Sequence, residues 1–66
     1  MPIFITLHYG DLSYTVNVAN ILFISRVETG KPYTVVKFYR NEIWVDETPE
    51  TIKNMIQAYV FDYYNK

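Results

Sequence analysis

The sequence of 66 residues contains no cysteine, one histidine and two glycines. Without cysteine the chain has neither disulfides nor thiolate metal sites, and one histidine excludes a multi-histidine metal site within a single chain. A Gly-rich phosphate loop is excluded too, since Gly10 and Gly30 lie far apart. We therefore expect no cofactor and no bound metal. A domain this small then depends on a dense aromatic core or on self-association for its stability.

Long apolar runs and clustered charge are also lacking. No segment approaches the roughly 18 apolar residues of a membrane span, and no signal peptide is visible, so we expect a cytoplasmic protein without membrane contact. The net charge is −1, and the six basic residues are spread along the chain. Because phosphate binding requires clustered Lys and Arg, this charge argues weakly against nucleic acid as a partner.

What the sequence does contain is alternating apolar and polar residues, which predict strands over 3–9 and 12–18. The intervening Gly10–Asp11 suits a two-residue type II′ turn with Gly first. Such a turn pairs Leu7 with Tyr14. The apolar faces of the two strands then coincide, which supports this register.

Three further strands are predicted over residues 21–27, 33–39 and 42–47 from their β-branched and aromatic content. A short bend separates the first of them from the preceding strand. A loop with Gly30 and Pro32 precedes the second, because Gly permits positive φ and Pro disfavours helix at the residue before it.

A two-residue turn at Arg40–Asn41 is predicted to join the last two strands. It would pair Val36 with Val45 on the core face. On the opposite face it would pair Lys37 with Trp44, as a cation–π contact.

A helix is predicted over 49–64, with Thr48 as its N-cap, Pro49 at its first position and Glu50 near its positive end. Apolar residues recur at helical spacing and predict one buried face: Ile52, Met55, Ile56, Tyr59, Val60 and Tyr63. The expected fold is α+β: a single domain over 1–66, with a five-strand antiparallel meander followed by one C-terminal amphipathic helix packed on one face.

Two polar groups are candidate chemical sites. The carboxylates of Asp46, Glu47 and Glu50 are suitable ligands for a hard cation, but a strand end followed by a helix N-terminus explains them better. His8 and Ser13 face each other across the first hairpin. They lack the orienting acid and oxyanion hole of a catalytic site, so we expect an exposed polar pair and no catalytic residues.

Arg40 is a third candidate, since a turn-tip Arg can contact a phosphate or carboxylate, although it is more often only solvated. Aromatic and basic residues of the strands suggest an interaction surface, which Phe61 and Tyr64 extend by widening the apolar side of the helix. The predicted surface comprises Arg26, Tyr33, Lys37, Tyr39, Trp44, Phe61 and Tyr64.

These features favour a non-enzymatic protein-interaction module that binds a protein partner and forms a homo-oligomer. Nucleic-acid binding is the alternative, because aromatic residues beside basic ones on a sheet can stack with bases. A small inhibitor or ligand sponge encoded by a mobile element is a further alternative.

The segment from Asn17 onward resembles the small FlbD-type flagellar-motility proteins, which have an Asn-led Ile-x-x-Ile strand, a Thr-Val-rich strand, a polar turn and a V-x-E-S/T step into a short helix. The resemblance covers about three quarters of the chain and implies a flagellar role without catalytic residues. The matching positions are Asn17, Ile21, Ile24, Thr34, Val35, Asn41, Val45, Glu47, Thr48, Glu50, Ile52 and Ile56.

The same segment is similar, more weakly, to the second half of a LytTR-type DNA-binding domain, where I-L-F-I, a hairpin and a strand-to-helix step recur. This resemblance implies DNA binding from basic loops. The loops predicted here carry Lys31 and Arg40.

Overall fold

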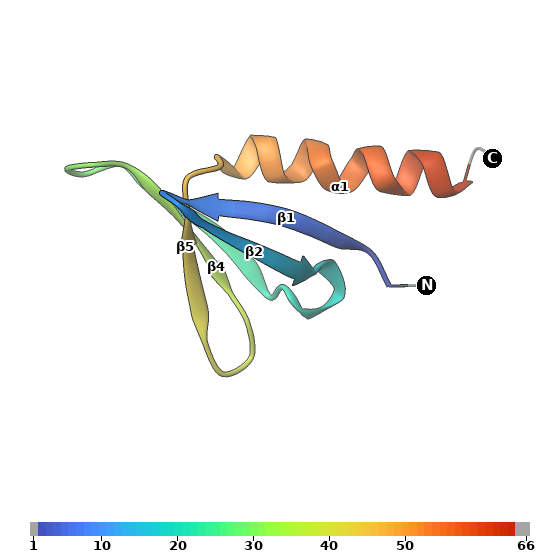
Figure 1. The fold of residues 1–66 in the computed structure, drawn as a ribbon, viewed down its shortest axis with the longest axis horizontal. Coiled ribbons are helices and arrows are strands. Elements are labelled where there is room, and N and C mark those ends of the chain that lie inside the picture. The colour runs from blue at the N-terminus through green and yellow to red at the C-terminus, as the bar shows by residue number, and fades with distance from the viewer. Residues whose placement is uncertain (1, 65–66) are drawn as a thin grey trace.

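Five strands precede one helix in the computed structural model, which describes residues 2–64 and the side chains of residues 2–62 (Figure 1). The α+β fold and the strand order of a meander are confirmed. Each strand is slightly shorter than predicted, whereas the helix has the predicted bounds. The elements are β1 (Phe4–Tyr9), β2 (Leu12–Asn17), the 3₁₀ turn η1 (Val18–Asn20), β3 (Phe23–Val27), β4 (Tyr33–Lys37), β5 (Glu42–Val45) and α1 (Pro49–Tyr64).

The strands form two antiparallel sheets, β1–β2 and β3–β4–β5. The division falls at η1, where the Asn17 side chain accepts a hydrogen bond from the Ala19 N–H at 3.1 Å. Short polar side chains that bond to nearby backbone favour such turns over a continuing strand. The turn ends β2 at Asn17 and delays β3 until Phe23, so the meander continues in a second sheet.

A backbone hydrogen bond outside the strand ladders joins the two sheets. The Asp46 N–H donates to the His8 carbonyl at 2.6 Å, just after β5 ends. The Leu22 N–H donates to the Lys37 carbonyl at 2.8 Å and extends the pairing of β3 with β4. The Asp46–His8 bond and the shared core hold the two sheets together.

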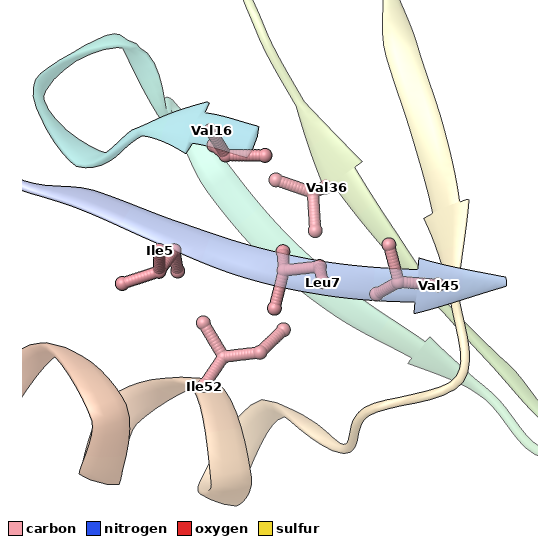
Figure 2. Close-up of a cluster of buried hydrophobic side chains, with 6 residues drawn as sticks. All are labelled: Ile5, Leu7, Val16, Val36, Val45 and Ile52. Atoms are coloured by element: carbon pink, nitrogen blue, oxygen red, sulfur yellow. The ribbon is translucent and has the colours of Figure 1, made fainter. Parts of the chain in front are cut away.

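The core lies between the two sheets and the first turns of α1 (Figure 2). Side chains from β1, β2, β4, β5 and α1 point toward one another there, and removing each from water contributes about 1.5–3 kcal/mol. The buried apolar residues are Ile5, Leu7, Val16, Val36, Val45 and Ile52.

The first hairpin has the predicted register, with Leu7 opposite Tyr14 and Tyr9 opposite Leu12. Gly10 has φ of +57°, and no other residue than Gly has positive φ between residues 2 and 64. A positive φ at the first turn residue and a negative one at Asp11 fit the type II′ turn expected for Gly-Asp.

The predicted register of the β4–β5 hairpin is wrong by two residues. Val36 lies opposite Ile43 and Lys37 opposite Glu42, not Trp44. The connection is a loop of residues 38–41, closed by a hydrogen bond from the Phe38 N–H to the Asn41 carbonyl at 2.8 Å. Two-residue hairpin turns need positive φ, which neither of the predicted turn residues adopts. A register shift of two residues leaves each side chain on the same face of the sheet, so Val36 and Val45 are still in the core.

The helix begins as predicted. The Thr51 N–H donates to Thr48 Oγ1 at 3.1 Å, so Thr48 is the N-cap and Pro49 takes the first helical position, where its missing N–H is harmless. No helix within residues 2–64 is long and apolar enough to cross a membrane.

The predicted buried face of α1 is correct only for its first half. Ile52 is buried, and Met55 and Ile56 pack against the core, but Tyr59 and Val60 are exposed. The side chain of Tyr63 lies outside the described part. Figure 1 shows the reason: the C-terminal half of α1 reaches past the N-terminal end of β1, so no sheet lies beneath it. The molecule is correspondingly elongated, with extents of 42 × 23 × 21 Å.

Candidate interaction surfaces

One face of the three-stranded sheet points away from the core and combines aromatic, aliphatic and charged side chains. Side chains alternate along a strand, so the register determines which residues share this face. We call it the outer sheet face. Its members are Phe23, Ser25, Val27, Tyr33, Val35, Lys37, Glu42 and Trp44.

Trp44 lies at the centre of an aromatic group on the outer sheet face. Its ring centroid is 4.6 Å from that of Tyr33, in a tilted stack, and 6.4 Å from that of Tyr9, in an edge-on arrangement. The Trp44 Nε1–H donates to Glu42 Oε2 at 3.3 Å. Such ring contacts contribute about 0.5–1.5 kcal/mol each and hold Trp44 in place. Trp44 is nevertheless 47% exposed, so its ring is held by its neighbours and is still accessible from solvent.

Three residues of the predicted surface meet on the outer sheet face, namely Tyr33, Lys37 and Trp44. Tyr39 is not part of the sheet. It lies in the 38–41 loop, exposed to solvent, with the Arg40 guanidinium carbon 5.7 Å from its ring centroid. The cation–π pair in this hairpin is therefore Arg40 with Tyr39.

Arg26 lies on the other side of the sheet. In the register it pairs with Thr34, which is fully buried, and its Nη1–H donates to Thr34 Oγ1 at 2.9 Å. Its Nε is also 3.5 Å from Glu28 Oε1. Arg26 therefore satisfies a buried hydroxyl and does not add positive charge to the outer sheet face.

The second half of α1 forms another apolar surface. Tyr59 is 50% and Val60 37% exposed, and both continue the stripe that Ile52 and Ile56 begin. We call Tyr59 and Val60 the distal stripe. Phe61 is exposed on another side of the helix, and the side chain of Tyr64 lies outside the described residues.

An open groove lies between β2, η1 and the 38–41 loop. Its lining mixes apolar residues such as Phe4, Leu22 and Phe38 with polar ones such as Asn17 and Asn20, and Arg40 is its charged member. The groove places the turn-tip Arg40 beside apolar residues from distant parts of the chain, which the sequence did not indicate.

The two carboxylates at the β5–α1 junction bind the backbone of the first hairpin. Glu47 Oε1 accepts from the His8 N–H at 2.8 Å, and Glu47 Oε2 from the His8 Nδ1–H at 2.6 Å. Asp46 Oδ2 accepts from the Gly10 N–H at 2.8 Å. His8 lies opposite Ser13 as predicted, but its ring is bonded to Glu47, a contact that the sequence did not indicate. The acidic residues at this junction thus fasten β1 to the start of α1.

Burial raises the pKa of Glu47, but the hydrogen bonds from the His8 backbone and ring and from its own backbone N–H outweigh this effect. The pKa therefore lies below its ordinary value of 4.5. The side chain is only 16% exposed. Glu47 is thus an ionised structural residue at neutral pH. Among residues 2–64, no three His, Asp or Glu side chains form a group able to hold a metal ion.

Sequence reasoning missed two aromatic residues: Tyr9, whose ring contacts that of Trp44, and Phe23, which lies on the outer sheet face. The predicted register of the first hairpin placed Tyr9 at its tip but did not indicate that β5 lies beside β1. Phe23 alternates with the half-buried Ile24 in β3 and is 56% exposed. Strict alternation along that strand was the signal available for it.

Comparison with known proteins adds no relative to this picture. No protein-family model matches the chain. No curated protein and no solved structure shows significant similarity to it either. The resemblances to FlbD-type proteins and to LytTR domains stay predictions.

Proposed function

We propose that the protein is a non-enzymatic protein-interaction module that also self-associates. The observation that carries this proposal is the exposure of large apolar side chains on a domain with a small core. Trp44 and Phe23 on the outer sheet face are each about half exposed, as is Tyr59 on the helix. Large apolar patches on a soluble domain mark sites of contact with other molecules.

The chemistry of these residues suits protein partners. Interface centres are enriched in Trp, Tyr and Phe, and the most important residues are those held rigidly before binding. The ring contacts of Trp44 with Tyr33 and Tyr9 meet that condition. Lys37 and Glu42 lie opposite each other at the edge of the same surface and provide a polar rim.

Light scattering combined with size-exclusion chromatography over a range of concentrations tests self-association. We expect a mass that rises from that of one chain toward that of two or more as the concentration increases. A matched control is Thr6→Lys, which adds one charge at an exposed position of β1 and is expected to leave the mass curve unchanged. A constant monomer mass up to millimolar concentration would reject self-association.

Single-stranded nucleic acid is a second candidate partner, because the tilted Tyr33–Trp44 stack has Lys37 on the same face of the sheet. Exposed aromatic rings beside a cation are the elements on which bases stack, at about 1–3 kcal/mol per base. The net charge of −1 and the position of Arg26 on the core side reduce the electrostatic attraction.

Titration with fluorescent single- and double-stranded oligonucleotides at two salt concentrations distinguishes these partners. Nucleic-acid binding predicts quenching of the Trp44 fluorescence, weaker affinity at higher salt, and loss of binding in Trp44→Leu. If the oligonucleotides leave the Trp44 fluorescence unchanged at both salt concentrations, nucleic acid is excluded as a partner of this surface and the protein-binding proposal stands.

A further inference from the structure

One edge of β2 has backbone groups without a partner. In the part of the chain that the structure describes, β2 pairs with β1 alone. Residue pairs in an antiparallel ladder alternate between those that exchange backbone hydrogen bonds and those that do not. The Val18 N–H donates to the Ile3 carbonyl at 2.9 Å in the same register, so the alternation directs the Thr15 N–H and carbonyl away from β1. Within residues 2–64, neither group of Thr15 has another hydrogen-bond partner.

This edge also lacks the features that usually prevent strand pairing. Soluble proteins protect exposed strand edges with charged residues, proline or bulges. The sequence of β2, LSYTVN, contains no charged residue and no proline, and its register with β1 is unbroken. In contrast, β3 at the edge of the other sheet contains Arg26. The edge of β2 is therefore suited to receive another strand.

The groove between β2, η1 and the 38–41 loop follows the same edge. Its lining includes residues 14–17 in succession. Side chains alternate between the two faces of a strand, so a groove that touches four consecutive residues lies along the edge of the strand. Its volume is about 690 Å³, within the range of roughly 300–1000 Å³ for ligand sites. An added strand would find apolar surface there for its side chains, from Phe4 and Phe38.

Arg40 is the only charged residue in the lining of this groove. Its guanidinium lies against the Tyr39 ring, whereas the ion pairs among the described residues are His8–Glu47 and Arg26–Glu28. The five N–H donors of a guanidinium match the two oxygens of a carboxylate. Since no Asp or Glu lines the groove, the charge that complements Arg40 has to come from the bound molecule.

The turn η1 limits where an added strand can end. β2 stops at Asn17, and η1 then turns the backbone out of line with the strand (Figure 1). The 38–41 loop starts at this end of the groove, because the Leu22 N–H donates to the Lys37 carbonyl. A strand paired with β2 therefore ends beside the loop that carries Arg40. A cation there repels an N-terminal amine and attracts a C-terminal carboxylate, so the added strand runs parallel to β2.

We propose that the edge of β2 binds the C-terminal end of a partner protein as an added parallel strand, with its terminal carboxylate bonded to Arg40. This inference rests on the proposed protein-interaction function and names a class of partner for it. Backbone hydrogen bonds to an open edge provide affinity in such complexes, and side-chain pockets provide specificity. The outer sheet face is a separate surface and stays open.

Titration with a defined peptide, followed by amide signals in NMR spectra, tests this site. The probe is acetyl-Ser-Val-Thr-Val-Leu with a free carboxylate, compared with the same peptide amidated at its C-terminus. We expect the amide signals of residues 14–17 to shift and the Thr15 amide to exchange more slowly with solvent. Amidation should raise the dissociation constant about 10-fold or more, because a hydrogen bond between charged groups is lost.

Two variants assign the contacts. Arg40→Gln should bind the free peptide about 10-fold or more weakly and no longer distinguish it from the amide. Lys31→Gln removes an exposed cation outside the groove and is the matched control, with unchanged binding expected. Thr15→Pro removes the N–H on the open edge, where proline is tolerated, and should also weaken binding. Circular dichroism confirms that each variant folds, and the exchange of the Thr15 amide in the unaltered protein tests the edge without a variant.

The other outcomes overturn the inference. Equal affinity for the free and the amidated peptide shows that Arg40 does not bind the terminal carboxylate. Equally tight binding of an amidated peptide with glutamate in place of its threonine assigns the carboxylate to a side chain. Shifts at residues 13–17 on dilution without peptide show that a second copy occupies the edge. No binding of either peptide at millimolar concentration rejects this site alone, because light scattering tests self-association independently.

Discussion

The two halves of α1 have the same kind of apolar stripe but lie in different surroundings. In the first half, Ile52 is completely buried and points toward Ile5 and Leu7 of β1 (Figure 2), whereas in the second half Tyr59 is half exposed. Helical periodicity reports which side of a helix is apolar but not how far the covering sheet extends. The extent of the strands beneath α1, not the sequence of α1, determines where the core of one chain ends (Figure 1).

The largest effect is expected for Ile52→Ala in the first half. The substitution leaves a cavity among Leu7, Ile5 and the start of the helix, so we expect the free energy of unfolding to fall by about 2–5 kcal/mol. Urea denaturation followed by circular dichroism measures this loss. A change below about 1 kcal/mol would mean that the first half of α1 is not part of the core.

A second substitution tests how the first half of α1 is started. Thr48→Ala removes the side chain that accepts from the Thr51 N–H, and we expect a loss of about 1 kcal/mol. Thr48→Ser retains the hydroxyl and serves as the control. Equal thermal midpoints for the two variants would show that the cap contributes nothing to the helix.

Glu47→Gln tests the attachment of the same end of α1 to the first hairpin. The folded-state pKa of Glu47 lies below its ordinary value, so ionised Glu47 stabilises the fold above that value, and this contribution is lost as the pH falls through the lowered folded pKa. We expect Glu47→Gln to lose about 1 kcal/mol near pH 7. Its stability should approach that of the unaltered protein in acid.

The measurement is urea denaturation at a series of pH values between neutral and strongly acidic. Asp11→Asn, an exposed carboxylate in the same hairpin, is the control and should follow the unaltered protein throughout. A Glu47→Gln deficit that is independent of pH would show that packing, not charge, fastens this junction.

The smallest effect on the folded monomer is expected in the second half of α1. Tyr59→Ser replaces a half-exposed ring, so we expect a change of no more than about 0.5 kcal/mol at dilution. The proposed self-association predicts that the thermal midpoint of the unaltered protein rises with concentration, and this rise should be smaller in the variant if Tyr59 lies in the contact. Thermal denaturation at two concentrations separates these effects. A large loss at both concentrations would show that Tyr59 belongs to the core of one chain.

Local sequence signals predicted those features that depend on neighbouring residues. Gly10–Asp11 correctly predicted the turn and register of the first hairpin, and Thr48-Pro49 predicted the start of α1. The prediction of a two-residue turn at Arg40–Asn41 was wrong, also for a local reason. Neither residue adopts the positive φ that a two-residue hairpin requires, and the loop lengthens to four residues.

Features that depend on distant residues were not predictable in the same way. Arg26 is not such a case, since alternation along β3 already places it on the core side with Ile24, but the bond between His8 and Glu47 depends on the return of β5 to β1. Periodicity along one segment contains no information on such contacts. The candidate surface was therefore predicted in part, with Tyr33, Lys37 and Trp44 together and Arg26 elsewhere.

The bonds that fasten the first hairpin to the start of α1 have a consequence for the order of folding. His8 and Glu47 are 39 positions apart, and Gly10 and Asp46 are 36 apart, so they close loops that contain most of the chain. Closing a long loop costs entropy before its contacts form. The β1–β2 hairpin can form early from neighbouring residues, whereas these bonds form only when β5 returns. We therefore expect these bonds to form late in folding, after the transition state. Weakening them should speed unfolding more than it slows folding.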